Sequence, residues 1–235
     1  MDADEGTASE EGRPVDGTEW PLKLRGVTET IVTTLGPNGL WNVAALGVFA
    51  PEDPPADTSG DDSPGEAADG KPATARTWGN TRTRRNFHRQ GEGYVQFVHD
   101  PEDFVAAAMT ITEREEPLLD SAQAWARIEV ESLETGNTGG TDWERWALEP
   151  SAAAVERTAV TPINRGFGAV IEATVAASRL GVSGYDDAVL EARLAHCLDV
   201  VDRTGGPAER RAFARLVESG SWNPAETRRR ENEWL

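Results

Sequence analysis

The sequence predicts a mainly β fold of the α+β class, in which about six antiparallel strands, spaced as in a barrel, precede a C-terminal helical module. Two observations carry this prediction. Between residues 24 and 149, short runs rich in Val, Ile and Thr alternate with turn residues. Between residues 151 and 220, apolar side chains recur at helical spacing instead.

The strands are predicted at residues 24–34, 40–49, 73–78, 93–100, 123–134 and 142–149. Asn38-Gly39 joins the first two, because both residue types tolerate the positive φ of a tight hairpin turn. Asp100 followed by Pro101 marks the start of one helix among the strands. In the second strand, side chains alternate between two faces: Asn42, Ala44 and Leu46 on one, Val43, Ala45 and Gly47 on the other.

The last third carries helix signals. Starts are predicted at Ser151, Thr161-Pro162 and Gly206-Pro207, and stops at Gly181, Gly205 and Gly220. The apolar faces of two helices are Ile163, Phe167, Val170, Ile171 and Thr174, and Leu190, Leu194, Cys197, Leu198 and Val201. We therefore expect a barrel domain over residues 20–150 and a helical module over 151–220.

Three acidic or polar stretches are expected to lie outside the packed core. Residues 1–19 are predicted to form a disordered acidic tail, and residues 221–235 a frayed C-terminus. Residues 51–74 open with a run of Pro, Gly and acids that cannot bury apolar surface, which predicts a surface insertion in the barrel domain.

The charge balance restricts the possible partners. The formal net charge is −18, and all but two of the 23 basic residues are arginines. Many acids with almost no lysine are typical of proteins from a salt-saturated cytoplasm, which favours a halophilic origin. The alternative is a polyanion mimic that binds basic partners. Duplex nucleic acid is not expected as a partner, because phosphate contacts need a broad basic face.

Several classes of chemistry have no motif here. The three histidines and the single Cys197 do not form a metal-ligand pattern, so no metal site is predicted. The phosphate-binding P-loop, the dinucleotide-binding glycine signature and the nucleophile elbow are all missing. There is no apolar run of membrane-spanning length and no signal-peptide pattern at the N-terminus, so a cytoplasmic protein is expected without a membrane partner.

One basic segment stands out from the acidic chain. Residues 75–90, ARTWGNTRTRRNFHRQ, contain five arginines, three threonines, two asparagines and no acid. Hydroxyls and cations on a loop between strands suit a bound phosphate. The alternative is a solvated basic turn that answers nearby surface acids.

The neighbouring motifs resemble those of known proteins. The strand containing Asn42 and the turn GNTRTRRNF are similar to the flavin-binding split-barrel proteins, which include flavin reductases and, more distantly, pyridoxamine phosphate oxidases. The string TPINRGFGAVIEATVAASRL, residues 161–180, resembles the helical region of a mainly archaeal FMN-binding split-barrel family of unknown function. Ala45 stands where the wider group usually has proline.

The resemblance implies an FMN-binding split barrel in which the flavin phosphate sits in the arginine-rich segment. It implies a flavin ring along the Asn42–Gly47 strand, a site near a homodimer interface, and hydride chemistry that belongs to the flavin, so no catalytic side chain is predicted. The implied cofactor-binding residues are Asn42, Ala44, Ala45, Gly47, Thr81, Arg82, Thr83, Arg84 and Asn86.

Two further positions have open roles. Asn164 and Arg165 could face the flavin or an anionic substrate, or pair structurally at the barrel–helix junction. Trp78 could stack on a ring or fill the core. The predicted function is a flavin reductase-like oxidoreductase with a small-molecule redox partner. The alternatives are a noncatalytic carrier of FMN or a similar phosphate-bearing cofactor, and a scaffold with an empty pocket.

Overall fold

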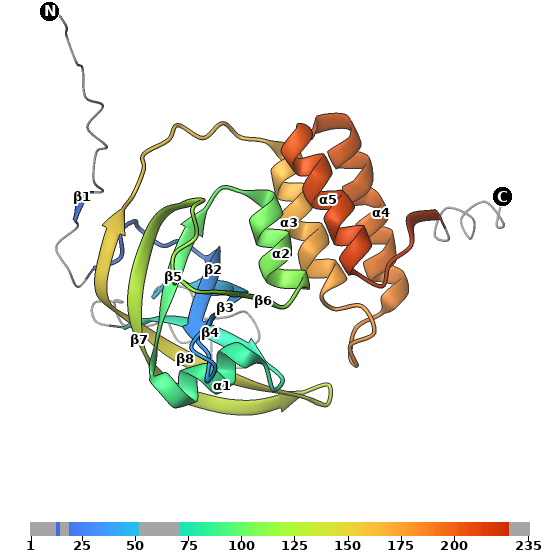
Figure 1. The fold of residues 1–235 in the computed structure, drawn as a ribbon. Helices are drawn as coiled ribbons and strands as arrows, with labels where there is room; N and C mark the ends of the chain where they lie inside the picture. The colour runs from blue at the N-terminus through green and yellow to red at the C-terminus, as the bar shows by residue number, and fades with distance from the viewer. Residues whose placement is uncertain (1–12, 15–18, 52–70, 226–235) are drawn as a thin grey trace, which may run out of the picture.

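Six strands close into an antiparallel barrel beside a helical bundle in the computed structural model, which describes residues 13–14, 19–51 and 71–225 (Figure 1). The strands are β1 (Arg13–Pro14), β2 (Val27–Leu35), β3 (Trp41–Phe49), β4 (Ala73–Trp78), β5 (Glu92–Val98), β6 (Thr112–Arg114), β7 (Ala122–Thr138) and β8 (Thr141–Val155). The order is β8-β4-β3-β2-β5-β7, and β7 pairs with β8 to close the ring, while β1 pairs with β8 and β6 with β3. The predicted fold class is confirmed.

Five helices complete the described chain: α1 (Arg82–Gln90), α2 (Pro101–Met109), α3 (Arg165–Ala177), α4 (Asp187–Thr204) and α5 (Pro207–Ser219). The helix predicted after Asp100 is confirmed as α2. The Asp100 side chain caps its N-terminus by accepting from the backbone N–H groups of Glu102 and Asp103. The barrel half holds a second helix, α1, where only one was expected.

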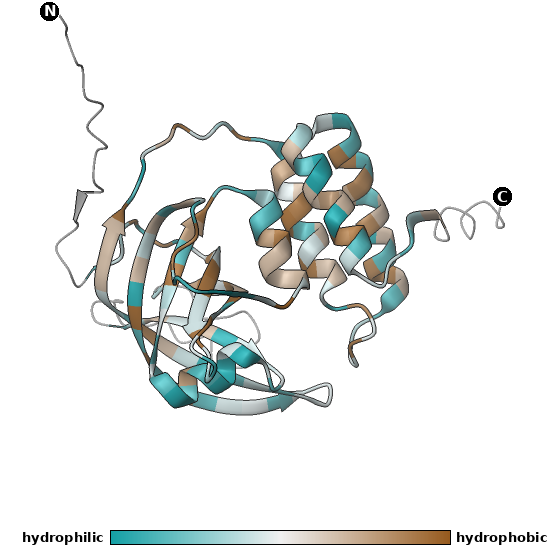
Figure 2. Ribbon diagram, viewed as in Figure 1, coloured by the Kyte–Doolittle hydropathy of each residue, from teal (hydrophilic) through white to brown (hydrophobic). Residues whose placement is uncertain are grey.

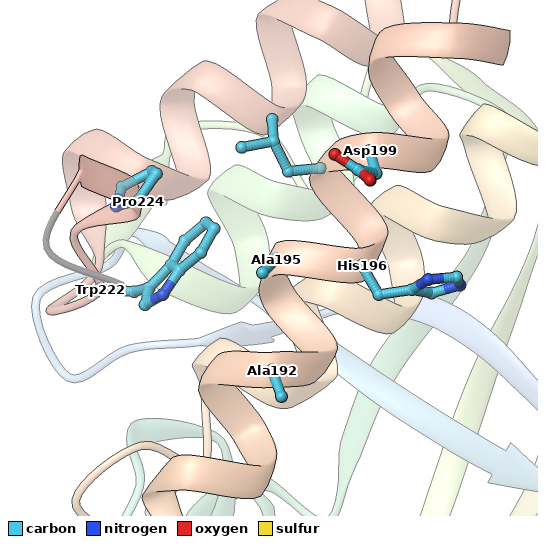
Figure 3. A pocket seen from close by; sticks show the side chains of 7 residues that line it. Ala192, Ala195, His196, Asp199, Trp222 and Pro224 are labelled. Atoms are coloured by element: carbon cyan, nitrogen blue, oxygen red, sulfur yellow. The ribbon is translucent and has the colours of Figure 1, made fainter. Parts of the chain in front are cut away.

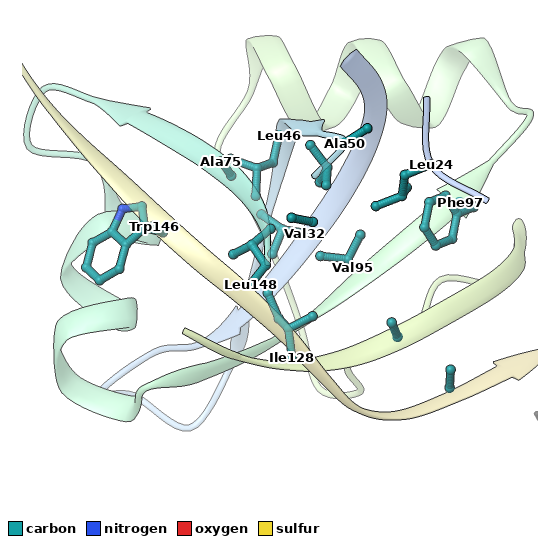
Figure 4. Close-up of a cluster of buried hydrophobic side chains, with 14 of the residues drawn as sticks. Leu24, Val32, Leu46, Ala50, Ala75, Val95, Phe97, Ile128, Trp146 and Leu148 are labelled. Atoms are coloured by element: carbon teal, nitrogen blue, oxygen red, sulfur yellow. The ribbon is translucent and has the colours of Figure 1, made fainter. Parts of the chain in front are cut away.

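Side-chain alternation on β3 divides the barrel wall into two faces, as predicted. Leu46 and Val48 point into the barrel core with Val32, Val95 and Leu148, and Figure 4 shows this cluster reaching Trp146. Val43 and Ala45 point outwards, where they pack with Phe104 of α2. One face of β3 therefore supports the barrel, and the other faces the helices.

Helix α2 joins the two halves of the molecule. Its Phe104 packs on the outer face of the barrel, while the adjacent Val105 is fully buried among α3, α4 and α5. The apolar bands of these helices face one another in Figure 2. The ring of His99, after β5, also stacks on Phe167 of α3 with 4.3 Å between centroids. These contacts fix the bundle against the outer face of β3.

The helical core largely follows the predicted pattern. Leu190, Leu194 and Cys197 of α4 are buried, and burial raises the pKa of the Cys197 thiol above its ordinary value. Gly205 and Gly220 end α4 and α5, and Pro207 begins α5. Ile163, predicted on the apolar face of a helix, is instead fully exposed, because α3 begins only after Asn164.

The helix expected from Ser151 is wrong. β8 continues to Val155, and Ala152, Ala153 and Ala154 pair with β7 in register. Cross-strand pairing overrides the helix propensity of an alanine run. At the other expected boundary, Ala73 and Thr74 belong to β4 rather than to the acidic insertion. The rest of that insertion lies mostly outside the described residues, as do most of the predicted N-terminal tail and residues 226–235 of the predicted frayed end.

Candidate functional site

The arginine-rich segment forms a helix rather than the loop expected from its sequence. β4 ends at Trp78, and α1 begins after Thr81, whose hydroxyl accepts from the backbone N–H of Arg84 at 3.3 Å. Gly91 ends the helix with a positive φ of 68°. A Thr N-cap and a Gly C-cap therefore define a nine-residue helix that the charge run concealed.

The arginines of α1 are engaged by other parts of the chain. Arg82 Nη1 lies 2.6 Å from Glu113 of β6, and Arg84 Nε lies 2.6 Å from Glu144 of β8. Arg85 donates to the carbonyl oxygen of Asn80 at 2.5 Å, and Arg89 donates to the carbonyl of Leu35. Much of the positive charge noted in the sequence thus has an internal partner.

Glu144 is the centre of a buried polar cluster. Its side chain is 1 % exposed and accepts from Ser132 Oγ at 2.6 Å and Arg84 Nε at 2.6 Å, with His88 Nε2 at 2.9 Å. Burial alone would raise the pKa of Glu144, but these three hydrogen bonds and the charge of His88 together hold it below its ordinary value. The carboxylate anchors α1 to the barrel wall.

Thr83 and Asn86 face β2 and β3. Both are buried: Asn42 Nδ2 donates to Thr83 Oγ1 at 3.4 Å, and Asn86 Nδ2 donates to Thr34 Oγ1 at 2.9 Å. Three of the predicted cofactor-binding residues, Asn42, Thr83 and Asn86, are therefore brought together, in contacts that join α1 to β2 and β3.

The alternation of β3 separates the other predicted residues. Ala44 packs against the barrel core, whereas Ala45 and Gly47 line a cavity on the opposite face. A Cβ at position 47 would lie 3.1 Å from Val27 Cγ1, closer than an ordinary contact. The small residues of β3 thus leave room against its outer face.

This cavity lies between the barrel and the helical bundle and has a volume of about 990 Å³. Its walls come from the outer faces of β2 and β3, the end of β4, α2, α3, the connection from α3 to α4 and the β7–β8 turn. The volume is at the upper end of the range for small-molecule sites. Gly79, at the end of β4, also lines it. Thr81 follows two residues later, within about 7.6 Å along the chain.

The lining combines aromatic rings with a few charges. Trp78 and Tyr185 contribute rings, and Trp78 is 38 % exposed, so the expectation that it fills the core is wrong. The charged lining residues in the described chain are Arg76, Arg179 and Glu29. The pKa of Glu29 is raised by burial, opposed by the charge of Arg179 and reinforced by Glu172.

Asn164 and Arg165 do not line this cavity. Asn164 Oδ1 accepts from the backbone N–H of Gly166 at 2.8 Å, and its Nδ2 donates to Glu209 of α5 at 3.1 Å. Asn164 therefore has the structural role of a helix cap, while Arg165 lies on the exposed first turn of α3.

The sequence did not single out several lining residues. Arg179 and Tyr185 lie on the helical module, more than 90 positions after Arg76, and no local motif joins them. Thr138, Gly139 and Thr141 belong to the β7–β8 turn, which was predicted only as a turn. The one available signal was that residues 161–180, which resemble a known family, include Arg179.

A second, smaller hollow of about 270 Å³ lies beside α4 and residues 222–224 (Figure 3). His196 points away from the Trp222 side of this hollow in Figure 3, so these two rings do not converge on one place. Among the described residues, no group of three or more His, Cys, Asp or Glu side chains could hold a metal ion. None of the described helices is long and apolar enough to cross a membrane.

Two family models match the chain. Residues 28–157 match "Protein of unknown function (DUF447) N-terminal domain", and residues 164–218 match "Protein of unknown function (DUF447)". The first match covers most of the barrel, and the second covers most of the helical bundle.

Solved structures to which the chain is similar include an FMN-bound DUF447 protein from Methanosarcina mazei. It is 23 % identical with a TM-score of 0.64, over 84 % of this chain and 96 % of its own. A flavin reductase of styrene monooxygenase from Pseudomonas putida is 12 % identical, with a TM-score of 0.33 over 57 % and 85 % of the two chains. A flavoredoxin from Methanosarcina acetivorans is 15 % identical, with a TM-score of 0.35 over 61 % and 79 %.

Proposed function

The chain belongs to the DUF447 family, and we propose that it is an FMN-binding flavoprotein that uses the cavity between barrel and bundle. The observation that carries the proposal is this cavity of about 990 Å³, lined by small residues of β3, aromatic rings and two arginines. The Methanosarcina mazei protein, described as FMN-bound, shares both parts of the fold.

The residues present fit FMN. A flavin is a flat ring system that carries a phosphate at the end of a flexible chain. Ala45 and Gly47 provide a wall of backbone and small side chains, against which a flat ring can approach closely. The hydroxyl groups of Thr138 and Thr141 line the same cavity and provide partners for polar groups of the flavin.

For the phosphate, we propose the first turn of α1. The helix N-terminus presents backbone N–H groups towards an anion, and Thr81 and Arg82 lie there. Gly79 of the cavity lining brings this turn within reach of a ligand in the cavity. The other implied residues would then support the site indirectly, by holding α1 and β3 in place. They are Asn42, Ala44, Thr83, Arg84 and Asn86.

The proposed reaction is of the flavin reductase type, in which hydride or electrons move between FMN and a small partner. When bound, FMN supplies the redox chemistry. The chain's own residues bind and orient the two molecules and exclude water from the space between barrel and bundle. The rival function is a carrier that holds FMN without turning over.

Two further proposals concern the assembly and its environment. We propose a homodimer with the flavin near the interface; Val160 and Ile163, fully exposed between β8 and α3, offer apolar surface to a second copy. Light scattering in concentrated KCl tests this, and a monomer at all protein concentrations would contradict it.

A cytoplasmic location in a halophile stays a prediction from composition.

The first experiment is a visible absorbance spectrum of the protein purified in multimolar KCl, with chromatographic identification of any molecule released on denaturation. We expect a yellow protein that releases FMN. Steady oxidation of NADH or NADPH would support the oxidoreductase, and tight binding without turnover would support the carrier. A colourless protein that does not bind added FMN would contradict both.

Gly47→Val tests the position of the flavin. The added side chain enters the cavity beside Val27, so we expect the Kd for FMN to rise at least about tenfold with an unchanged circular dichroism spectrum. Gly168→Val is the matched control, because a Cβ at position 168 on α3 meets nothing within 4 Å. Equal affinities for the two variants would exclude the outer face of β3 as the flavin site.

A further inference from the structure

Two arginines line the cavity of a strongly acidic chain. Arg76 and Arg179 contribute two positive charges to its lining, and Glu29 contributes the one carboxylate among the described lining residues. The whole chain has a formal net charge of −18. Arginine side chains in the lining of a cavity favour anions, even where the rest of the protein is strongly acidic.

Arg179 is held on the helical wall of this cavity by an aromatic ring. It follows the end of α3, and its guanidinium carbon lies 5.2 Å from the centroid of the Tyr185 ring. The N–H groups of a guanidinium lie in its own plane, so a ring beneath its face leaves them free to donate. A carboxylate or phosphate can accept two of them at once. Both residues line the cavity, so this geometry is presented to a ligand.

Arg179 also lacks the close acid that engages Arg82 and Arg84. Within the described ranges, no carboxylate oxygen lies within 4 Å of its guanidinium. Glu29 is close enough to respond to its charge without forming that contact. The guanidinium lies over the Tyr185 ring, and Arg179 lines the cavity.

Two serines share the cavity lining with Arg179. Ser178 precedes it, and Ser183 lies on the connection to α4, where both line the cavity. The β7–β8 turn closes against this connection: a Cβ at Gly139 would lie 2.9 Å from the carbonyl oxygen of Ser183. Arg179 therefore lines the part of the cavity that is bounded by the β7–β8 turn and the α3–α4 connection.

We propose that Arg179 binds the anionic group, a phosphate or carboxylate, of the small molecule that exchanges electrons with the flavin. The assignment rests on the proposed function in taking flavin as the redox group. It divides the two anions between two places: the flavin phosphate at the start of α1, and the anion of the second molecule at the end of α3.

The test separates binding of an anion from binding of FMN. Inorganic phosphate and malonate are titrated by calorimetry at constant KCl concentration, into wild type, Arg179→Gln and Arg165→Gln, each with and without added FMN. Arg165→Gln removes the same charge from the exposed first turn of α3, outside the cavity. The FMN dissociation constant of each protein is measured separately by flavin fluorescence.

We expect saturable binding of at least one probe to wild type, binding at least tenfold weaker in Arg179→Gln, and no change in Arg165→Gln. FMN affinity should stay within threefold in both variants. Tighter binding of phosphate would point to a nucleotide or phosphorylated substrate, and tighter binding of malonate to a carboxylic acid.

Absence of saturable binding, or equal weakening by the two variants, would overturn the assignment. A more than tenfold loss of FMN affinity in Arg179→Gln alone would also overturn it, because Arg179 would then bind the flavin phosphate. If wild type binds the probes through Arg179 but binds no FMN, the anion site stands and the proposed flavin function fails. Arg179→Lys, which keeps a point charge, should recover part of the probe binding.

Discussion

The arginines of α1 and those of the cavity have different kinds of contact. Arg82 and Arg84 each form an ion pair at 2.6 Å with an acid of the barrel, whereas Arg179 lies over the ring of Tyr185. Arg76 likewise lies 4.4 Å from the centroid of Trp143. The arginines of α1 are largely structural, whereas Arg76, from the same basic segment, and the distant Arg179 line the cavity.

The difference shows that the number of arginines in a segment does not tell which of them line a cavity. Glu113 and Glu144, which engage the α1 arginines, lie 31 and 60 positions further along the chain. Only the pairing of β8 with β4, and of β6 with β3, brings these acids to the helix. Substitutions in the two groups should therefore affect different properties, stability for α1 and ligand binding for the cavity.

The largest effect on stability is expected from Glu144→Ala. The change leaves Arg84 half-buried without its carboxylate and removes partners of Ser132 and His88, so we expect a loss of about 3 kcal/mol in the free energy of unfolding. Urea denaturation at constant KCl measures it. Glu131→Ala, on the exposed face of β7, is the control and should change stability by less than about 0.5 kcal/mol. Equal losses would show that Glu144 is not the anchor of α1.

The same carboxylate gives a dependence on pH. Because the folded-state pKa of Glu144 is lowered, its stabilising effect is fully present above the ordinary value of 4.5 and is lost as the pH falls through the folded-state pKa. The stability difference between wild type and Glu144→Gln should shrink below pH 4.5. A constant difference down to pH 3 would contradict the assignment.

Asn86→Ala should have the next largest effect. It removes the donor to Thr34 Oγ1 at 2.9 Å and the acceptor of Arg89 at 2.8 Å from a site that is 3 % exposed, and we expect a loss of about 2 kcal/mol. Thermal unfolding in the absence of FMN measures the structural part. An unchanged Tm together with lost FMN binding would instead make Asn86 a direct ligand.

The sequence predicted the fold better than the site, and the reason is physical. Strand and helix signals such as Asp100-Pro101 are local, and the alternation on β3 follows from backbone geometry alone. The cavity depends on how α3 and the β7–β8 turn pack beside β3, which no local pattern contains. A resemblance supplied Ala45 and Gly47, but the resemblance did not include Arg76 or Arg179 among the implied residues.

A smaller effect of opposite sign is expected at Glu29. Since burial raises the pKa of Glu29, the folded state favours its protonated form, and its contribution to stability is lost as the pH rises above 4.5 through the folded-state pKa. Glu29→Gln should therefore match wild type near pH 4 and be more stable at pH 7. Urea denaturation at both values measures this, and a variant less stable than wild type at pH 7 would be contrary to it.

The smallest effect on stability is expected from Arg82→Gln, which gives the comparison of the two arginine groups its strictest test. The Arg82–Glu113 pair is 40 % and 28 % exposed, and exposed pairs contribute little, so the loss should be below about 0.5 kcal/mol.

Arg82 is nevertheless the α1 arginine proposed to bind the flavin phosphate. If it does so, Arg82→Gln should weaken FMN binding about tenfold, because a charged hydrogen bond to a phosphate is lost. Glu113→Gln, which breaks the same ion pair but keeps the arginine, should leave FMN affinity unchanged or improved. If both variants bind FMN as wild type does, Arg82 is structural like Arg84, and the phosphate must be sought elsewhere, first at Arg76 or Arg179.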